Sequence, residues 1–119
     1  MVKNQKIVLI GAGSLQFGLG AAGSIIHSEI LEGSTICLHD IDEESLNLAR
    51  TACKSAIEEE KLNFNLESTT NRQEALKNAT FIINSIEVAP RFKLWDQDQE
   101  IPRKFGNKQV FGENGGPGG

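Results

Sequence analysis

The sequence predicts an α/β fold, a doubly wound parallel sheet with helices on both faces. Short, unbroken apolar runs alternate along the chain with stretches whose apolar residues recur at helical spacing. Unbroken apolar runs of this length are typical of strands that are buried on both faces of a parallel sheet. Regular alternation of strands and helices favours right-handed crossovers between parallel strands. We therefore expect the order strand-helix-strand-helix-strand-helix-strand.

The first strand is expected at about 6–10, where an apolar run follows a lysine. Gly11 and Gly13 come directly after it, and a helical pattern then extends over roughly 14–31. Apolar residues at steps of three and four predict one buried stripe on this helix, consisting of Leu15, Leu19, Ala22, Ile26 and Ile30.

A second strand is expected over 35–39, and the helix after it is expected to begin at Asp42. An aspartate side chain can accept hydrogen bonds from the first amides of a helix, and Glu43 and Glu44 suit its positive end. Spacing again predicts the buried stripe, which consists of Leu46, Ala49, Cys53, Ala56 and Ile57.

The alternation continues in the second half of the chain. A short strand is expected over 63–70, a short helix over 72–77 and a buried apolar strand over 80–86. After these elements the apolar side chains are spread among charged ones, which predicts one or two helices interrupted at Pro102.

Composition limits the classes of protein to consider. The chain has 119 residues, which suits one small domain, and a net charge of -4 with scattered Lys and Arg. Without a basic stripe, nucleic acid and anionic membranes are not expected partners. The sequence has neither an apolar run long enough for a membrane span nor a signal region, so we expect a cytoplasmic protein. Cys37 and Cys53 are then expected to be free, buried thiols.

The turn after the first strand carries the strongest functional signal. Gly11 allows a tight turn, and Gly13 allows the backbone to approach a pyrophosphate at the positive end of a helix. Gln16 stands where a third glycine is usual in this pattern. A strand, a glycine turn and a helix together predict a dinucleotide site.

Asp40 ends the second strand, at the place where a bound ribose lies in such folds. A carboxylate there accepts hydrogen bonds from both ribose hydroxyls, would repel a 2'-phosphate, and has no arginine after it. We therefore expect NAD rather than NADP. The alternative role for Asp40 is helix capping, although Asp42 is better placed for it.

Polar residues also end the fourth strand, and ligands bind beyond the carboxyl ends of strands in such sheets. Asn84 and Ser85 are expected to contact the nicotinamide side of the cofactor. A local role, in which they bond neighbouring backbone, is equally open. Glu87 and Arg91 could face a substrate, or form a surface ion pair.

Several segments together carry a resemblance to a known family. They are Gly11-Ala12-Gly13-Ser14-x-x-Phe17, Asp40-Ile41-Asp42-Glu43-Glu44-x-Leu46, the strand with Asn84, Ile101-Pro102-x-Lys104-Phe105-Gly106, and Glu113-Asn114-Gly115-Gly116-Pro117-Gly118-Gly119. Over essentially its whole length the chain resembles the N-terminal, Rossmann-like NAD-binding domain of family 4 glycoside hydrolases. The cofactor-binding residues then expected are Gly11, Gly13, Ser14, Gln16, Phe17, Asp40, Ile41, Asn84 and Ser85.

The resemblance implies an NAD- and divalent-metal-dependent glycosidase, usually with manganese, that works by oxidation, elimination, addition and reduction. Residues 1–119 would be its dinucleotide-binding domain and a fragment of a longer chain that forms homo-oligomers. The family's catalytic tyrosine and metal-binding Cys and His have no counterpart here, since the chain lacks tyrosine and neither Cys37 nor Cys53 fits. The fragment alone is therefore expected to be inactive.

The resemblance also bears on the substrate, an α-glucoside, α-galactoside or α-galacturonide. Glu87 stands where members that act on phospho-sugars tend to have Arg, and a carboxylate would repel a sugar phosphate. A non-phosphorylated glycoside is therefore expected. Glu113 and Asn114 resemble residues that line the sugar pocket, or are ordinary turn residues. Two alternatives remain, a dehydrogenase of the lactate or malate type and a non-catalytic nucleotide-binding module.

Overall fold

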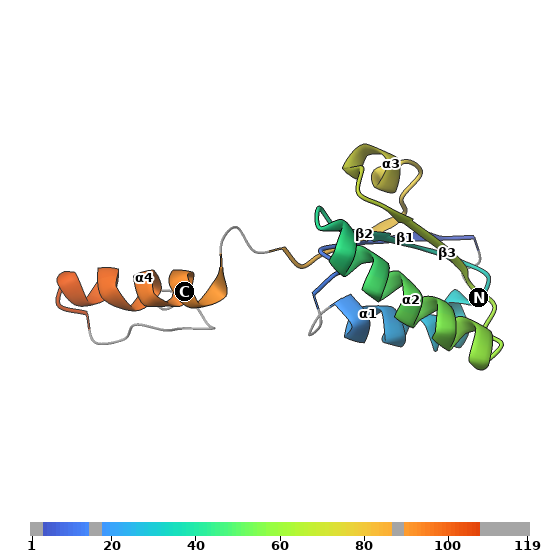
Figure 1. Ribbon diagram of the computed structural model, residues 1–119, viewed down its shortest axis with the longest axis horizontal. Coiled ribbons are helices and arrows are strands. Elements are labelled where there is room, and N and C mark those ends of the chain that lie inside the picture. Colours follow the sequence, from blue (N-terminus) through green and yellow to red (C-terminus); the bar gives the residue numbers. More distant parts are fainter. Residues whose placement is uncertain (1–3, 15–17, 87–89, 108–119) are drawn as a thin grey trace. The chain divides into compact units, whose positions relative to one another are not determined.

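The computed structural model describes residues 4–14, 18–86 and 90–107 of the chain. The chain divides into two compact units, Met1–Ile86 and Glu87–Gly119. Among the described residues, the first unit contains the sheet and three α-helices, and the second contains one long helix (Figure 1).

The first unit is built on a four-stranded sheet in the order β3-β2-β1-β4. The strands are β1 (Lys6–Ile10), β2 (Thr35–His39), β3 (Asn65–Thr69) and β4 (Phe81–Asn84). All three strand pairs are parallel. This arrangement confirms the predicted doubly wound α/β fold, in which β1 lies at the centre and the chain crosses over between strands.

Helices cover both faces of this sheet. Helices α1 (Gly18–Ile26) and α2 (Glu43–Glu59) lie on one face, and the short α3 (Arg72–Leu76) lies on the other (Figure 1). Because strand side chains alternate between faces, Ile7 and Leu9 pack in the core with α1 and α2, whereas Val8 packs with Ala75 of α3. The larger core is therefore on the face of the two long helices.

Helix α2 matches the pattern expected from its sequence. Leu46, Ala49 and Cys53 are buried, and Ala56 and Ile57 pack against them. Both cysteines are free and buried. Burial raises the pKa of each thiol, because it disfavours the thiolate. They are core side chains, as expected.

The first helix is shorter than the predicted 14–31. Helix α1 ends at Ile26, and a separate 3-10 turn, η1, covers Glu29–Leu31. The backbone changes register where the Ser28 amide bonds to the carbonyl of Ile25, three residues back. Ile30 is consequently 64% exposed, so its place in the predicted buried stripe is wrong, whereas Ile25 is buried.

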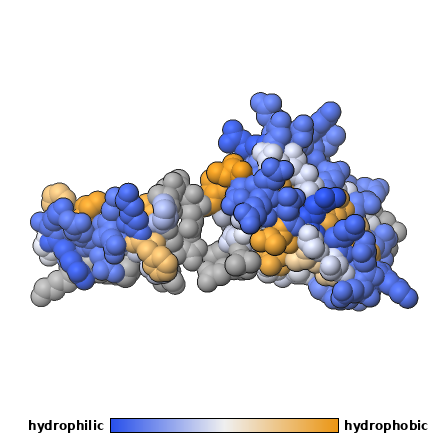
Figure 2. Space-filling model, in the orientation of Figure 1, coloured by the Kyte–Doolittle hydropathy of each residue, from blue (hydrophilic) through white to orange (hydrophobic). Residues whose placement is uncertain are grey.

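The prediction of a buried fourth strand is also wrong. Phe81 and Ile82 of β4 are both 54% exposed and Ile83 is 42% exposed. The reason is position, because among the described residues β4 is an edge strand that pairs only with β1. Figure 2 shows hydrophobic side chains on the surface of this unit among the hydrophilic ones.

The second unit contains α4 (Arg91–Lys104). The predicted interruption at Pro102 is wrong, since the helix continues through it and ends two residues later, where the Phe105 amide bonds to the carbonyl of Pro102. Phe92 and Trp95 pack edge to face, with ring centroids 5.7 Å apart. No helix in the described part of the chain is long and apolar enough to cross a membrane.

Candidate functional site

The glycine turn after β1 is held by backbone hydrogen bonds to the end of β2. The amides of Gly11 and Ala12 donate to the carbonyl oxygen of His39 at 2.9 and 3.0 Å, and the amide of Ser14 donates to Gly11 at 3.1 Å. Gly11 has a φ of +86°, and a Cβ there would lie 2.5 Å from the carbonyl oxygen of Ser85. Both the conformation and the space therefore require glycine at this position.

Gly18, the first residue of α1, packs directly against this turn. Its amide donates to the carbonyl of Ser14 at 2.9 Å, and a Cβ on it would collide with the carbonyl oxygen of Ala12. In glycine turns of this type the third glycine allows close packing of the helix on the strand. Sequence spacing pointed to position 16 for that glycine and placed Gly18 too late for the role, although a glycine early in the helix already favoured close packing there.

Asp40 links the two strand ends. Its Oδ2 accepts the amide of Gly13 at 2.9 Å, and its Oδ1 accepts the amide of Asp42 at 3.0 Å. A Cβ on Gly13 would lie 2.8 Å from Oδ2 and 2.6 Å from the Cβ of Ser45. In this structure, therefore, Gly13 is a glycine because Asp40 and Ser45 lie against it. Sequence reasoning missed the part that Ser45 plays.

Asp42 caps α2, as predicted. Its Oδ1 accepts the amides of Glu44 and Ser45 at 3.0 and 3.3 Å, and its Oδ2 accepts the Ser45 hydroxyl at 3.0 Å. The side-chain bond from Ser45, followed by the backbone bond, lowers the pKa of the Asp42 carboxyl. The cap also fixes Ser45, whose Cβ faces Gly13.

A buried histidine lies beneath the turn. His39 is 3% exposed, and its Nδ1 donates to the carbonyl of Thr69 on β3 at 2.9 Å. The backbone carbonyl of the same residue accepts the two amides of the turn. His39 is thus a satisfied core side chain whose main chain positions the turn.

The end of β4 reaches the same edge of the sheet. The Ser85 amide and hydroxyl both donate to the carbonyl of Ile10, at 2.9 and 3.3 Å. Ser85 therefore has the local role that the sequence left open, while the side chain of Asn84 is exposed. Ile41, beside Asp40, is 91% exposed. The structure thus brings together the glycine turn, Asp40 and Ser85.

The side chains of the remaining predicted site residues are not among those that the structure describes. Arg91 begins α4 in the other unit, and its side chain is not among those described. Gln16, Phe17, Glu87, Glu113 and Asn114 lie outside the described residues. Within the described ranges no group of three or more His, Cys, Asp or Glu side chains could hold a metal ion.

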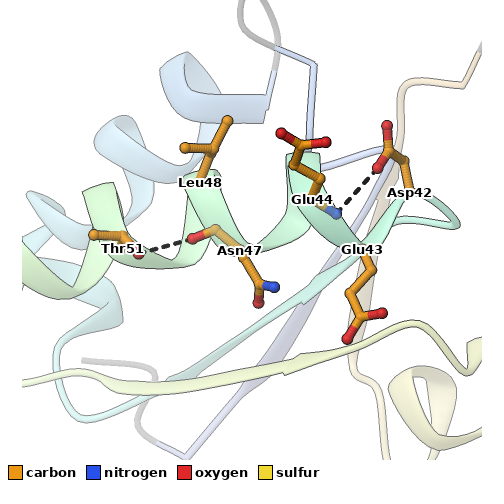
Figure 3. A pocket seen from close by; sticks show the side chains of 6 residues that line it. All are labelled: Asp42, Glu43, Glu44, Asn47, Leu48 and Thr51. Carbon is orange, nitrogen blue, oxygen red and sulfur yellow. Dashed lines mark hydrogen bonds between the residues drawn. The ribbon is translucent and has the colours of Figure 1, made fainter.

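An open hollow lies along α2 and begins at its cap residue. It is lined by Asp42, Glu43, Glu44, Asn47, Leu48 and Thr51 (Figure 3). Two hydrogen bonds in this hollow stay within the helix and its cap, since Asp42 accepts the Glu44 amide and the Thr51 hydroxyl donates to the backbone carbonyl of Asn47 at 2.8 Å. The carboxyl edge of the sheet carries the glycine turn and the strand-end carboxylate Asp40. This chemistry makes that edge the better candidate site.

The hydrogen bonds already formed at the carboxyl edge of the sheet limit what this edge can offer a ligand. A carboxylate has about four acceptor positions, of which Asp40 uses two for the amides of Gly13 and Asp42. Two positions therefore remain. The amides of residues 11–14 all have acceptors inside the protein, so this segment offers a ligand no unused amide.

A parallel sheet with a glycine turn after β1 and a carboxylate at the end of β2 defines the Rossmann-like class of folds. Within that class, the chain belongs to the family 4 glycosyl hydrolases, since the profile of the family matches residues 6–119. An α-glucosidase from Erwinia rhapontici is 52% identical over 114 residues, which are 96% of this chain and 25% of that protein.

Solved structures agree with this assignment. A 6-phospho-α-glucosidase from gut microorganisms, in complex with NAD and glucose-6-phosphate, is 30% identical with a TM-score of 0.71, over 98% of this chain and 26% of that one. Another, in complex with NAD and Mn²⁺, is 24% identical with a TM-score of 0.72 at the same coverage, and shows the shared fold. The chain thus spans about a quarter of the length of these relatives.

Proposed function

We propose that the carboxyl edge of the sheet binds NAD, and that the chain is the dinucleotide-binding part of a family 4 glycosidase. The observation that carries the proposal is the bond from the Gly13 amide to Asp40. This bond joins the glycine turn and the strand-end carboxylate into one continuous surface. A dinucleotide that lies across two strands requires such a surface.

The ribose end of the proposed site is Asp40. Its two remaining acceptor positions equal in number the vicinal hydroxyls of an adenosine ribose. A 2'-phosphate has no proton to donate in place of the 2'-hydroxyl, and its charge opposes that of the carboxylate. The residues present therefore fit NAD better than NADP. Ile41, exposed beside the carboxylate, offers an apolar surface to the adenine.

The diphosphate would lie over the turn, near Ser14 and the amino end of α1, where a helix favours an anion. Since the amides of residues 11–14 already have acceptors, its amide donors would come from beyond Ser14. Gln16 and Phe17 remain our candidates there. Asn84 and Ser85, at the end of β4, would contact the nicotinamide side.

For the whole protein we propose hydrolysis of a non-phosphorylated α-glycoside in a cytoplasmic homo-oligomer. The relative that is 52% identical is named an α-glucosidase, and Glu87 would oppose a sugar phosphate. NAD would supply hydride transfer and a divalent metal such as Mn²⁺ would stabilise negative charge. This chain would contribute the cofactor site, with Glu87, Arg91, Glu113 and Asn114 toward the sugar, while the metal ligands and catalytic residues would lie in other parts of the polypeptide.

The experiment is calorimetric titration of the chain with NAD and NADP. We expect tighter binding of NAD, and a loss of about 10- to 100-fold in Asp40→Ala, because hydrogen bonds to a charged acceptor contribute about 1.5–3 kcal/mol. Equal or tighter binding of NADP would refute the assignment. Turnover of a chromogenic α-glycoside by this chain alone, with NAD and Mn²⁺ added, would refute the proposal that the metal ligands and catalytic residues belong to other parts of the polypeptide.

A further inference from the structure

We propose that Asp40 is a positioning residue for the glycine turn, in addition to the ribose contact proposed above. By accepting the Gly13 amide, Asp40 holds the turn in its binding conformation before any ligand arrives. This inference rests on the proposed NAD site and adds a second task to one of its residues.

The geometry gives each carboxylate oxygen one backbone partner. Oδ2 of Asp40 accepts the Gly13 amide from the turn after β1, and Oδ1 accepts the Asp42 amide from the turn after β2. A single side chain therefore bridges two loops that come from neighbouring strands. Hydrogen bonds from an amide to a carboxylate are stronger than those between neutral groups.

The space around Gly13 shows that this contact is specific. Any Cβ at that position would lie 2.8 Å from Oδ2 of Asp40 and 2.6 Å from the Cβ of Ser45. The absence of a side chain at Gly13 thus allows the carboxylate to reach the backbone. A glycine that is usually explained by the approach of a ligand is explained here by the approach of the protein's own carboxylate.

The position of Asp40 is supported by the amino end of helix α2. Asp42, whose amide bonds Asp40, also caps α2 through the amides of Glu44 and Ser45. Helix α2 is in turn anchored in the core by Leu46, which is 3% exposed. A displacement of the turn would therefore have to break the Gly13 bond or move the end of a packed helix.

The consequence concerns the other half of the site. The turn determines where the chain leaves β1 and enters α1, whose first residue, Gly18, bonds back to Ser14. The amino end of α1 is the proposed place of the diphosphate. Asp40 would thus influence the binding of a group that it does not touch.

The first measurement needs no ligand. Amide hydrogen exchange is followed by NMR in the wild type, in Asp40→Asn and in the control Glu43→Gln, which removes a neighbouring charge at the start of α2. In Asp40→Asn the side-chain NH₂ must face one of the two backbone donors. We expect exchange at Gly13 or Asp42 to be at least about tenfold faster than in the wild type and the control. Unchanged protection at both amides overturns the proposal.

The second measurement separates positioning from ribose binding. Adenosine and ADP are titrated into the wild type, Asp40→Ala and Asp40→Asn, and the ratio of their dissociation constants gives the increment that the diphosphate adds. We expect this ratio to fall by about tenfold in the variants, although removal of a negative charge alone would favour ADP. If Asp40 serves the ribose only, both ligands weaken equally, and an unchanged or increased ratio overturns the proposal.

Failure of the two proposals can be told apart. If neither adenosine nor ADP binds the wild type, the NAD site is wrong, and the exchange of Gly13 and Asp42 without ligand still decides whether Asp40 holds the turn. Circular dichroism checks that each variant folds. Should Asp40→Ala fail to fold, the isosteric Asp40→Asn carries both measurements.

Discussion

Strands β1 and β4 lie side by side, and both consist largely of aliphatic or aromatic residues, yet their surroundings are opposite. Leu9 of β1 is 2% exposed, whereas its register partner Ile83 of β4 is 42% exposed. Strand β1 has a strand on each side and helices over both faces, while β4 has one neighbour among the described residues. An apolar run therefore specifies a strand, but only its neighbours decide whether it is buried.

The same contrast divides the candidate site. The glycine turn and Asp40 follow β1 and β2, whose side chains are almost fully buried, so they are carried by the best-packed part of the unit. Asn84 ends the exposed β4, and Ser85 follows it. The adenosine half of the proposed site is therefore carried by better-buried strands than the nicotinamide half.

The largest expected effect comes from truncating the two register partners. Leu9→Ala should lower the free energy of unfolding by about 2–5 kcal/mol, because it leaves a cavity in the core. Ile83→Ala should cost about 1 kcal/mol, since much of that side chain is already in water. Urea unfolding at several protein concentrations measures both. Equal costs would mean that β4 is covered in solution, and would remove the contrast.

A second comparison lies within α1, between its end at the site and its exposed side. Gly18→Ala should destabilise by about 1–3 kcal/mol, because the new Cβ meets the Ala12 carbonyl. A Cβ on Gly20 would have no atom within 4 Å apart from the neighbouring backbone of its own helix, so Gly20→Ala should stabilise by about 0.4–1 kcal/mol. Thermal unfolding of the pair measures the difference. If both substitutions changed the stability in the same direction, this result would contradict the close packing of α1 against the turn.

The smallest effect is a pH dependence far from the site. His27 Nδ1 lies 2.6 Å from the Gly23 carbonyl, and Nε2 lies 2.7 Å from Oε2 of Glu60. Both partners are acceptors, so the protonated ring satisfies both. The bond to Gly23, followed by that to Glu60, raises the pKa of His27 above its ordinary 6.5.

Since the folded-state pKa of His27 is raised, its contribution to stability is complete below pH 6.5 and is lost as the pH rises through the folded value. The stability difference between the wild type and His27→Gln should therefore shrink with rising pH. Glu60→Gln should weaken this dependence. Denaturation curves across that range measure it, and a difference that does not vary with pH would show that the pair is not formed in solution.

The sequence predicted those features that local chemistry determines. The cap by Asp42 needs only amides two and three residues ahead, and the stripe of α2 needs only helical spacing. The end of α1 was missed because a register change at Ser28 competes with the apolar pattern that runs on to Ile30.

The parts of the site that were predicted are likewise those that local sequence determines. Gly11 and Asp40 were found because each stands at the end of a recognisable strand. The contacts of Gly13 with Asp40 and Ser45, and of Gly18 with Ala12, join segments that are brought together only by the folded sheet. Helical spacing or a glycine motif carries no information on such contacts.

The central claim is that NAD lies over the ends of β1 and β2, and NMR titration of the isotope-labelled chain tests it most directly. The account predicts that the amide signals of Gly11, Gly13 and Asp40 shift most, and that they saturate together. Shifts confined to the outer side of α2, around Asn47 and Thr51, or an absence of saturable shifts at the turn, would contradict it.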